Sequence, residues 1–99
     1  MSDYENAFNA VYMATGICKT KVISRSRLWP VQEARLLFVL LLSRRGYDDQ
    51  KVAMVLERNR TTILKSRHTA EDYIKLSSLF HDKYKKASEA YAECQVSNS

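Results

Sequence analysis

The sequence predicts an all-α fold, a compact bundle of about five helices. Two observations support this prediction. The 99 residues include only two Gly and one Pro, fewer turn-forming residues than a hairpin-rich β fold would need. Apolar residues also recur three and four positions apart along most of the chain, which is the spacing of a helix face. We expect one domain over residues 1–92 and a flexible tail over residues 93–99.

The first predicted helix covers residues 2–16. Ser2 and Glu5 have the spacing of a capping box, and Gly16 is placed to end the helix. One face of this helix is apolar, and we expect it to pack in the core. Its members are Tyr4, Ala7, Phe8, Val11 and Tyr12.

The next segment, residues 17–30, has no clean periodicity and is rich in basic residues. It carries Lys19, Lys21, Arg25 and Arg27. We predict a basic loop here, leading into a helix over about residues 30–45 that Gly46 ends. Pro30 is tolerated in the first turn of such a helix. After Arg35 this helix is apolar nearly all round, which predicts a central, buried position.

Three shorter patterns predict the remaining helices. Residues 47–58 have Asp48 or Asp49 as a cap and an inward stripe of Val52, Val55 and Leu56. Residues 59–76 have Asn59 or Thr61 as a cap, with Ile63, Ala70, Tyr73 and Ile74 on one side. A last helix begins at residue 78, capped by Ser77, with Phe80, Tyr84, Ala87 and Tyr91 as its apolar face. That face could form a dimer seam, but we favour packing against the core and hence a monomer.

The basic charge is concentrated in the middle of the chain. The net charge is +5, and residues 19–68 hold 12 Lys/Arg against 4 Asp/Glu. Such a distribution indicates a negatively charged partner, either nucleic acid or an anionic membrane. The longest apolar run, residues 36–42, is too short to span a membrane, and the chain start lacks the pattern of a secretory signal. We expect a cytoplasmic protein without a membrane partner, in a bacterium or in the host if a phage encodes it.

Nothing in the sequence predicts catalysis. Cys18 and Cys94 are far apart and most simply reduced thiols, and no zinc-type cluster is present. His68, Glu71 and Asp72 have the spacing of a metal pair but no further ligands nearby. No phosphate-loop motif is present, which argues against nucleotide binding. We therefore predict no enzyme activity, no metal and no cofactor.

The stretch LERNRTTILKSR, residues 56–67, carries the strongest functional signal. The predicted helices on either side of residue 58 form a candidate helix-turn-helix, whose second helix enters the major groove with its first residues. Side chains suited to base edges follow one another here: Arg58, Asn59, Arg60, Thr61 and Thr62. Lys65 and Arg67 lie one turn further on, where they could contact phosphates.

In the order of these parts, the chain resembles the C-terminal DNA-binding domain (domain IV) of the bacterial chromosomal replication initiator DnaA, over about residues 4–92. Residues 24–35, SRSRLWPVQEAR, look like the segment that opens the long helix of that domain. Residues 57–63, ERNRTTI, look like its signature of the type Gly-Arg-Asp-His-Thr-Thr-Val. Residues 77–91 look like its terminal helix. The resemblance implies a Trp-repressor/DnaA C-terminal-like fold and binding of double-stranded DNA.

The resemblance also implies roles for individual positions. In the DnaA family an arginine of the basic loop enters the minor groove, and Arg27 stands nearest that position with Arg25 close by. Base contacts fall on the positions of Asn59, Arg60 and Thr61, while Thr62 and Arg58 match the signature directly. The implied role is control of replication or transcription, as a stand-alone protein of a bacterium, phage or mobile element.

This sequence departs from the DnaA pattern at several positions. Glu57 replaces the signature glycine, Asn59 the aspartate and Arg60 the histidine. An amide prefers adenine where a carboxylate prefers cytosine, so the initiator's own box is not the expected target. Leu28, Trp29 and Pro30 replace more basic residues. These departures motivate an alternative function: a helical protein-interaction module that no longer reads DNA. Trp29 itself could touch DNA sugar, but we favour packing at the helix start.

Overall fold

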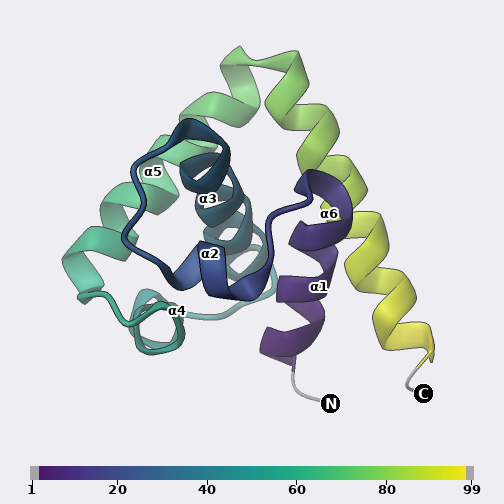
Figure 1. The fold of residues 1–99 in the computed structure, drawn as a ribbon, viewed down its shortest axis with the longest axis horizontal. Coiled ribbons are helices and arrows are strands. Elements are labelled where there is room, and N and C mark those ends of the chain that lie inside the picture. Colours follow the sequence, from purple (N-terminus) through teal and green to yellow (C-terminus); the bar gives the residue numbers. More distant parts are fainter. Residues whose placement is uncertain (1–2, 98–99) are drawn as a thin grey trace.

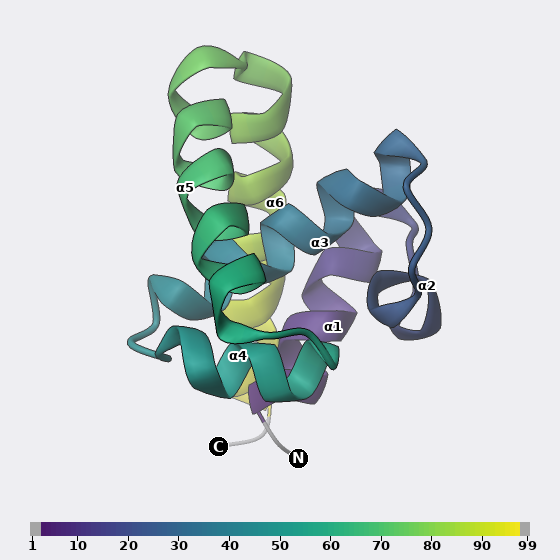
Figure 2. The same cartoon turned by 90° about the vertical axis from the view of Figure 1, so that its left-hand side faces the viewer.

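A computed structural model describes residues 3–97, and their backbone is helical apart from short connections. Figure 1 shows the arrangement of the helices, and Figure 2 shows it from the side. Their bounds are α1 Asp3–Thr15, α2 Lys19–Ile23, α3 Trp29–Ser43, α4 Asp49–Leu56, α5 Arg60–Leu76 and α6 Ser78–Ser97. The described residues contain no strand, so the predicted all-α bundle is confirmed.

α3 is the central helix, as its sequence predicts. Ten of its fifteen residues are buried, and every position from Leu36 to Leu42 is among them. α1, α5 and α6 pack around it, and α2 and α4 contact it less extensively. The rings of Phe8 and Phe38 stack with centroids 4.2 Å apart, joining α1 to α3. Apart from Ser43 at its end, α3 reaches solvent only in its first two turns.

One ion pair joins the centre of this bundle to its last helix. Glu33 is buried on α3, and its carboxylate accepts a hydrogen bond from Lys83 Nζ on α6 at 2.5 Å. A buried carboxylate is costly unless it is paired, so Lys83 is needed where α6 crosses α3.

The helix ends follow the local chemistry of the sequence. Asp48 caps α4 by accepting from Lys51 N at 2.9 Å, and Asn59 caps α5 by accepting from Thr62 N at 2.8 Å. Ser77 Oγ accepts from Phe80 N at 3.2 Å, at the corner between α5 and α6. Gly16 and Gly46 end α1 and α3 with positive φ angles of 78° and 94°. These predicted stops and caps are confirmed, whereas Ser2 lies outside the described residues.

Three expectations about the fold need correction. The basic segment is not one loop, because Lys19–Ile23 forms a short helix whose Val22 is buried; the described residues therefore form six helices rather than five. Tyr12 is more than half exposed instead of belonging to the core face of α1. α6 continues to Ser97, so residues 93–97 are helical rather than a tail beyond the domain. Residues 98 and 99 lie outside the described part.

The apolar face of α6 packs against the core, as expected. Phe80, Ala87 and Tyr91 are buried, and Tyr84 packs partly buried against the same cluster. The Arg45 guanidinium lies over the Tyr91 ring, 4.5 Å from its centroid. This face is therefore already covered within one chain.

The central position of α3 makes its leucines the most sensitive apolar residues. We expect Leu40→Ala to lower the free energy of unfolding by about 2–5 kcal/mol, because Leu40 is fully buried and a cavity would remain. The matched control is Leu76→Ala, at a leucine that is 85% exposed, with an expected change within about 0.5 kcal/mol. Urea denaturation followed by circular dichroism measures both. Equal losses in the two variants would contradict this assignment of the core.

Candidate nucleic-acid interface

α4 and α5 are joined by a tight connection of three residues. Glu57 ends α4 in the left-handed region, with φ 56° and ψ 45°, and Arg58 N donates to Ala53 O at 2.9 Å. Asn59 then opens α5 as its cap. Glu57 occupies the position where the DnaA signature carries glycine. The backbone there has the conformation that glycine adopts without steric cost.

Arg58 fastens this connection to the basic segment. Its Nη2 donates to the carbonyl oxygens of Ile23 at 3.2 Å and Ser24 at 2.7 Å. Its Nη1 donates to Leu56 O at 3.2 Å, on its own side of the contact. Arg58 is one of the residues predicted to contact DNA. Its guanidinium contacts backbone carbonyls, which gives it a positioning role for the loop, and its predicted DNA contact stays a prediction.

Arg35, from the second turn of α3, holds the same segment from another side. Its Nε donates to Val22 O at 3.0 Å and its Nη2 to Ser24 O at 2.5 Å. Burial, and then the nearby charge of Arg58, lower the pKa of Arg35 from its ordinary value. The Ser24 carbonyl thus accepts from two guanidinium groups. Together they fix the path of the chain just before Arg25 and Arg27.

A cavity of about 400 Å³ opens beside these two anchors. It is lined by Arg25, Ser26, Arg27, Gln32, Arg35 and Arg58. Arg25 and Arg27 are exposed at its rim, and neither makes an ion pair within the described part of the chain. Four guanidinium groups therefore surround one concave site that no lining carboxylate neutralises. Such a site attracts anions.

A second cavity, of about 300 Å³, lies between the start of α3 and the outer face of α5. It is lined by Trp29, Gln32, Arg35, Leu36, Thr62, Lys65, Ser66, Thr69 and Tyr73. Trp29 is 45% exposed and Tyr73 is 37% exposed, and their ring centroids lie 5.3 Å apart at a tilt of 53°. The rings form an aromatic wall beside hydroxyl groups and the Lys65 ammonium.

The two cavities adjoin because Gln32 and Arg35 line both. Gln32 Nε2 also donates to Arg27 O at 2.6 Å, which links the start of α3 to the loop. We call the combined surface the basic groove, defined by the lining residues of both cavities. No Asp or Glu is among those residues.

The structure brings four of the predicted site residues to this groove in addition to Arg58. Arg25 and Arg27 reach it from the loop, and Thr62 and Lys65 from α5. Arg60 lies elsewhere, beside a cavity that it shares with Asp48, Asp49 and Gln50. The reason is helical geometry: Arg60 and Thr62 are two positions apart, about 200° around the helix.

The other three predicted site residues either bond within the protein or lie outside the groove. Arg67 forms a bidentate pair with Asp49 across α4 and α5, with Nε–Oδ1 at 3.0 Å and Nη2–Oδ2 at 3.2 Å. The hydrogen bond to Asp49 raises the pKa of Arg67. Thr61 is exposed but does not line the groove, and Asn59 uses its side-chain oxygen for capping. The DNA contacts predicted for these residues stay predictions.

The groove residues from α3 and from the middle of α5 were not among the residues predicted from the sequence. Gln32 and Arg35 are spaced as the one polar strip of an otherwise apolar helix. Thr62, Ser66, Thr69 and Tyr73 repeat at helical intervals along α5. Both strips can be recognised as spacing patterns in the sequence. That the two strips face each other depends on how α5 packs against α3, which periodicity does not give.

Comparison with known proteins gave no relative. No protein-family model, no curated protein and no solved structure matches this chain. The likeness to the DnaA domain therefore rests on the quoted motifs alone. No described helix is both long enough and apolar enough to cross a membrane. Among the described residues no group of three or more His, Cys, Asp or Glu is placed to hold a metal ion.

The left-handed backbone at Glu57 generates a stability prediction. We expect Glu57→Gly to raise the free energy of unfolding by about 0.5–1 kcal/mol, because glycine has no Cβ to clash with the backbone at a positive φ. Glu57→Ala is the matched control, since it removes the same charge but keeps the Cβ. Urea denaturation of both variants is the measurement. A gain of equal size with alanine would assign the effect to charge instead of backbone strain.

The anchoring role of Arg58 generates a second prediction about stability. Lysine cannot reproduce the planar set of donors that contacts three or more carbonyls, so we expect Arg58→Lys to destabilise the protein by roughly 1–3 kcal/mol. Arg25→Lys makes the same exchange at an exposed loop arginine, and little change is expected there. Urea denaturation compares them. Unchanged stability in Arg58→Lys would contradict the anchoring role.

Proposed function

We propose that the protein binds double-stranded DNA, with the basic groove and the start of α5 against the duplex. The observation that carries the proposal is the groove itself. Five basic residues line it and no acidic residue does. A rigid concave surface of one charge sign suits the phosphate backbone, which supplies much of the affinity of DNA-binding proteins.

The connection between α4 and α5 supports a helix-turn-helix mode of binding. It is three residues long and ends in a capped helix whose first turn is exposed at Arg60, Thr61 and Thr62. In that mode these residues meet base edges in the major groove. Arg25 and Arg27 would then reach the backbone or the adjacent minor groove, because Arg58 and Arg35 hold their loop beside α5.

The pairing of Arg67 refines the expected contacts. Because its guanidinium is committed to Asp49, phosphate contacts fall to Lys65 and to the two loop arginines. Arg60 contributes from the opposite side of the first turn of α5. This division assigns sequence reading to the tip of α5 and most of the affinity to the groove. The biological setting we propose is control of replication or transcription.

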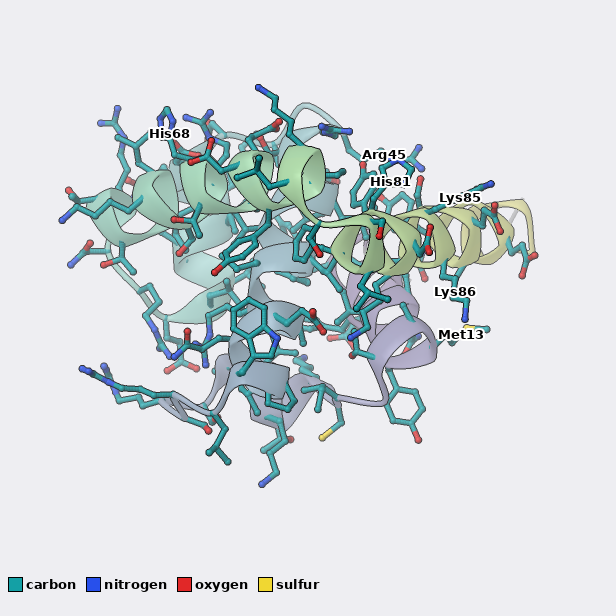
Figure 3. All side chains as sticks on the ribbon, turned by 90° about the horizontal axis from the view of Figure 1, so that it is seen from above. Met13, Arg45, His68, His81, Lys85 and Lys86 are labelled. Atoms are coloured by element: carbon teal, nitrogen blue, oxygen red, sulfur yellow. The ribbon has the colours of Figure 1, made fainter. Side chains whose placement is uncertain are left out.

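The test of this proposal is fluorescence anisotropy with a labelled duplex of about 20 base pairs, titrated at several salt concentrations. We expect Arg27→Ala and Lys65→Ala each to weaken binding and to reduce the salt slope by about 0.9, the value for one lost phosphate contact. Lys85→Ala is the matched control. It removes the same charge from an exposed lysine of α6, far from the start of α5 (Figure 3).

The outcomes separate the two functional classes. Equal weakening by Lys85→Ala would mean that only net charge matters and would contradict the groove. Absence of binding even at low salt would overturn the DNA proposal. It would favour a protein-interaction module instead, for which the exposed Leu28, Leu76 and Leu79 offer apolar contacts.

A separate experiment tests the reading helix. We expect Arg60→Ala to reduce the preference between a selected duplex and a scrambled one by an amount corresponding to about 1–3 kcal/mol. The selected duplex comes from random sequences by enrichment on the parent protein. An unchanged preference in Arg60→Ala would remove this residue from the reading surface.

A further inference from the structure

We infer that the basic groove also holds one unpaired nucleotide of single-stranded DNA, with its base on the aromatic wall and its phosphate among the arginines. The inference rests on features that duplex binding does not use. A duplex presents stacked bases whose faces are covered, so it has no use for exposed aromatic rings at the bottom of a groove. An unpaired base has a free face, and stacking on an aromatic side chain is how single strands are commonly bound.

The aromatic half of the groove fits a base in size and chemistry. Its cavity of about 300 Å³ is bounded by Trp29 and Tyr73, whose rings stay 45% and 37% exposed. The Tyr73 ring is held from behind by Phe80, with centroids 5.8 Å apart. The wall is therefore backed by the core, although both rings face solvent. Thr62, Ser66 and Thr69 supply hydroxyl groups along its edge, which tolerate any base because they donate and accept.

The arginine half lies where the phosphate of the same nucleotide would be. Gln32 and Arg35 line both cavities, so the two halves share a border. The guanidinium groups of Arg35 and Arg58 both point at the Ser24 carbonyl, which keeps two like charges close together. An anion between them would relieve that repulsion. Arg25 and Arg27 at the rim add donors with no competing ion pair within residues 3–97.

The pairing of an aromatic pocket with an adjoining cationic pocket selects a nucleotide over other occupants. An acidic peptide would satisfy the arginines but would not need exposed aromatic rings beside them. An apolar peptide would cover the rings but would leave the positive charge of four guanidinium groups uncompensated. A nucleotide carries both features within one unit, an aromatic plane and a negative charge.

The sequence provides a direct probe, because Trp29 is the only tryptophan. We would titrate the parent protein with a 15-residue oligothymidylate and follow intrinsic fluorescence. The comparison strand has the same length and charge but carries abasic sugars in place of thymidines. The expected result is quenching by oligothymidylate and little quenching by the abasic strand. Equal effects of the two strands would overturn the stacking inference, because the phosphates alone would then explain binding.

Variants make the test independent of fluorescence. With end-labelled oligothymidylate, anisotropy should show binding weakened about tenfold by Trp29→Ala, the scale of one lost stacking contact. Arg27→Ala should reduce the salt slope by about 0.7, the single-strand value for one phosphate. Lys85→Ala should change neither. Trp29→Ala should not change affinity for the abasic strand, which controls for a general loss of fold.

The result is distinguishable from failure of the duplex proposal. Duplex binding with no quenching by oligothymidylate would overturn this inference and leave the proposed function standing. Quenching by oligothymidylate without duplex binding would support this inference and overturn the proposed function. The protein would then bind single strands.

Discussion

α3 has almost no polar face, and the rest of the fold is arranged to cover it. A helix that is apolar all round must be surrounded, and here five other helices share that task. The first two turns of α3 reach solvent, and they hold all of its polar side chains except Ser43 at its end. The basic groove forms at these first turns. Its floor is therefore part of the helix that carries much of the core.

A second constraint turns this exposed end into a site. The basic segment is anchored by Ile17, Val22 and Ile23, which pack in or against the core, but residues 24–27 carry no apolar side chain. Two guanidinium groups replace the missing apolar contacts by binding its carbonyl oxygens. Hydrogen bonds from charged donors are stronger than those from neutral donors. Arg35 and Arg58 both order the loop and make its surroundings positive. The order of the loop and the charge of the groove therefore come from the same two side chains.

The sequence predicted most of the fold because its signals are local. Caps at Asp48, Asn59 and Ser77 depend on neighbouring residues only, and the all-round apolar pattern of α3 is visible in the letters. The short helix α2 was missed because its five residues carry one buried side chain and no periodic signal. At the site, the residue types predicted a basic surface but did not predict which residues would line it. Whether Arg58 and Arg67 face solvent or a partner depends on residues 18 or more positions away, which local pattern cannot supply.

The ion pair between buried Glu33 and partly exposed Lys83 has a consequence for how α6 packs on α3. The core face of α6 repeats similar residues, with Phe80, Tyr84 and Tyr91 at helical spacing. A slide of α6 by one turn, about 5.4 Å, would therefore still bury an aromatic face. The same slide would separate the ammonium from a carboxylate that has almost no access to water. Apolar packing supplies the affinity between these helices, and the ion pair adds an electrostatic penalty for sliding out of register.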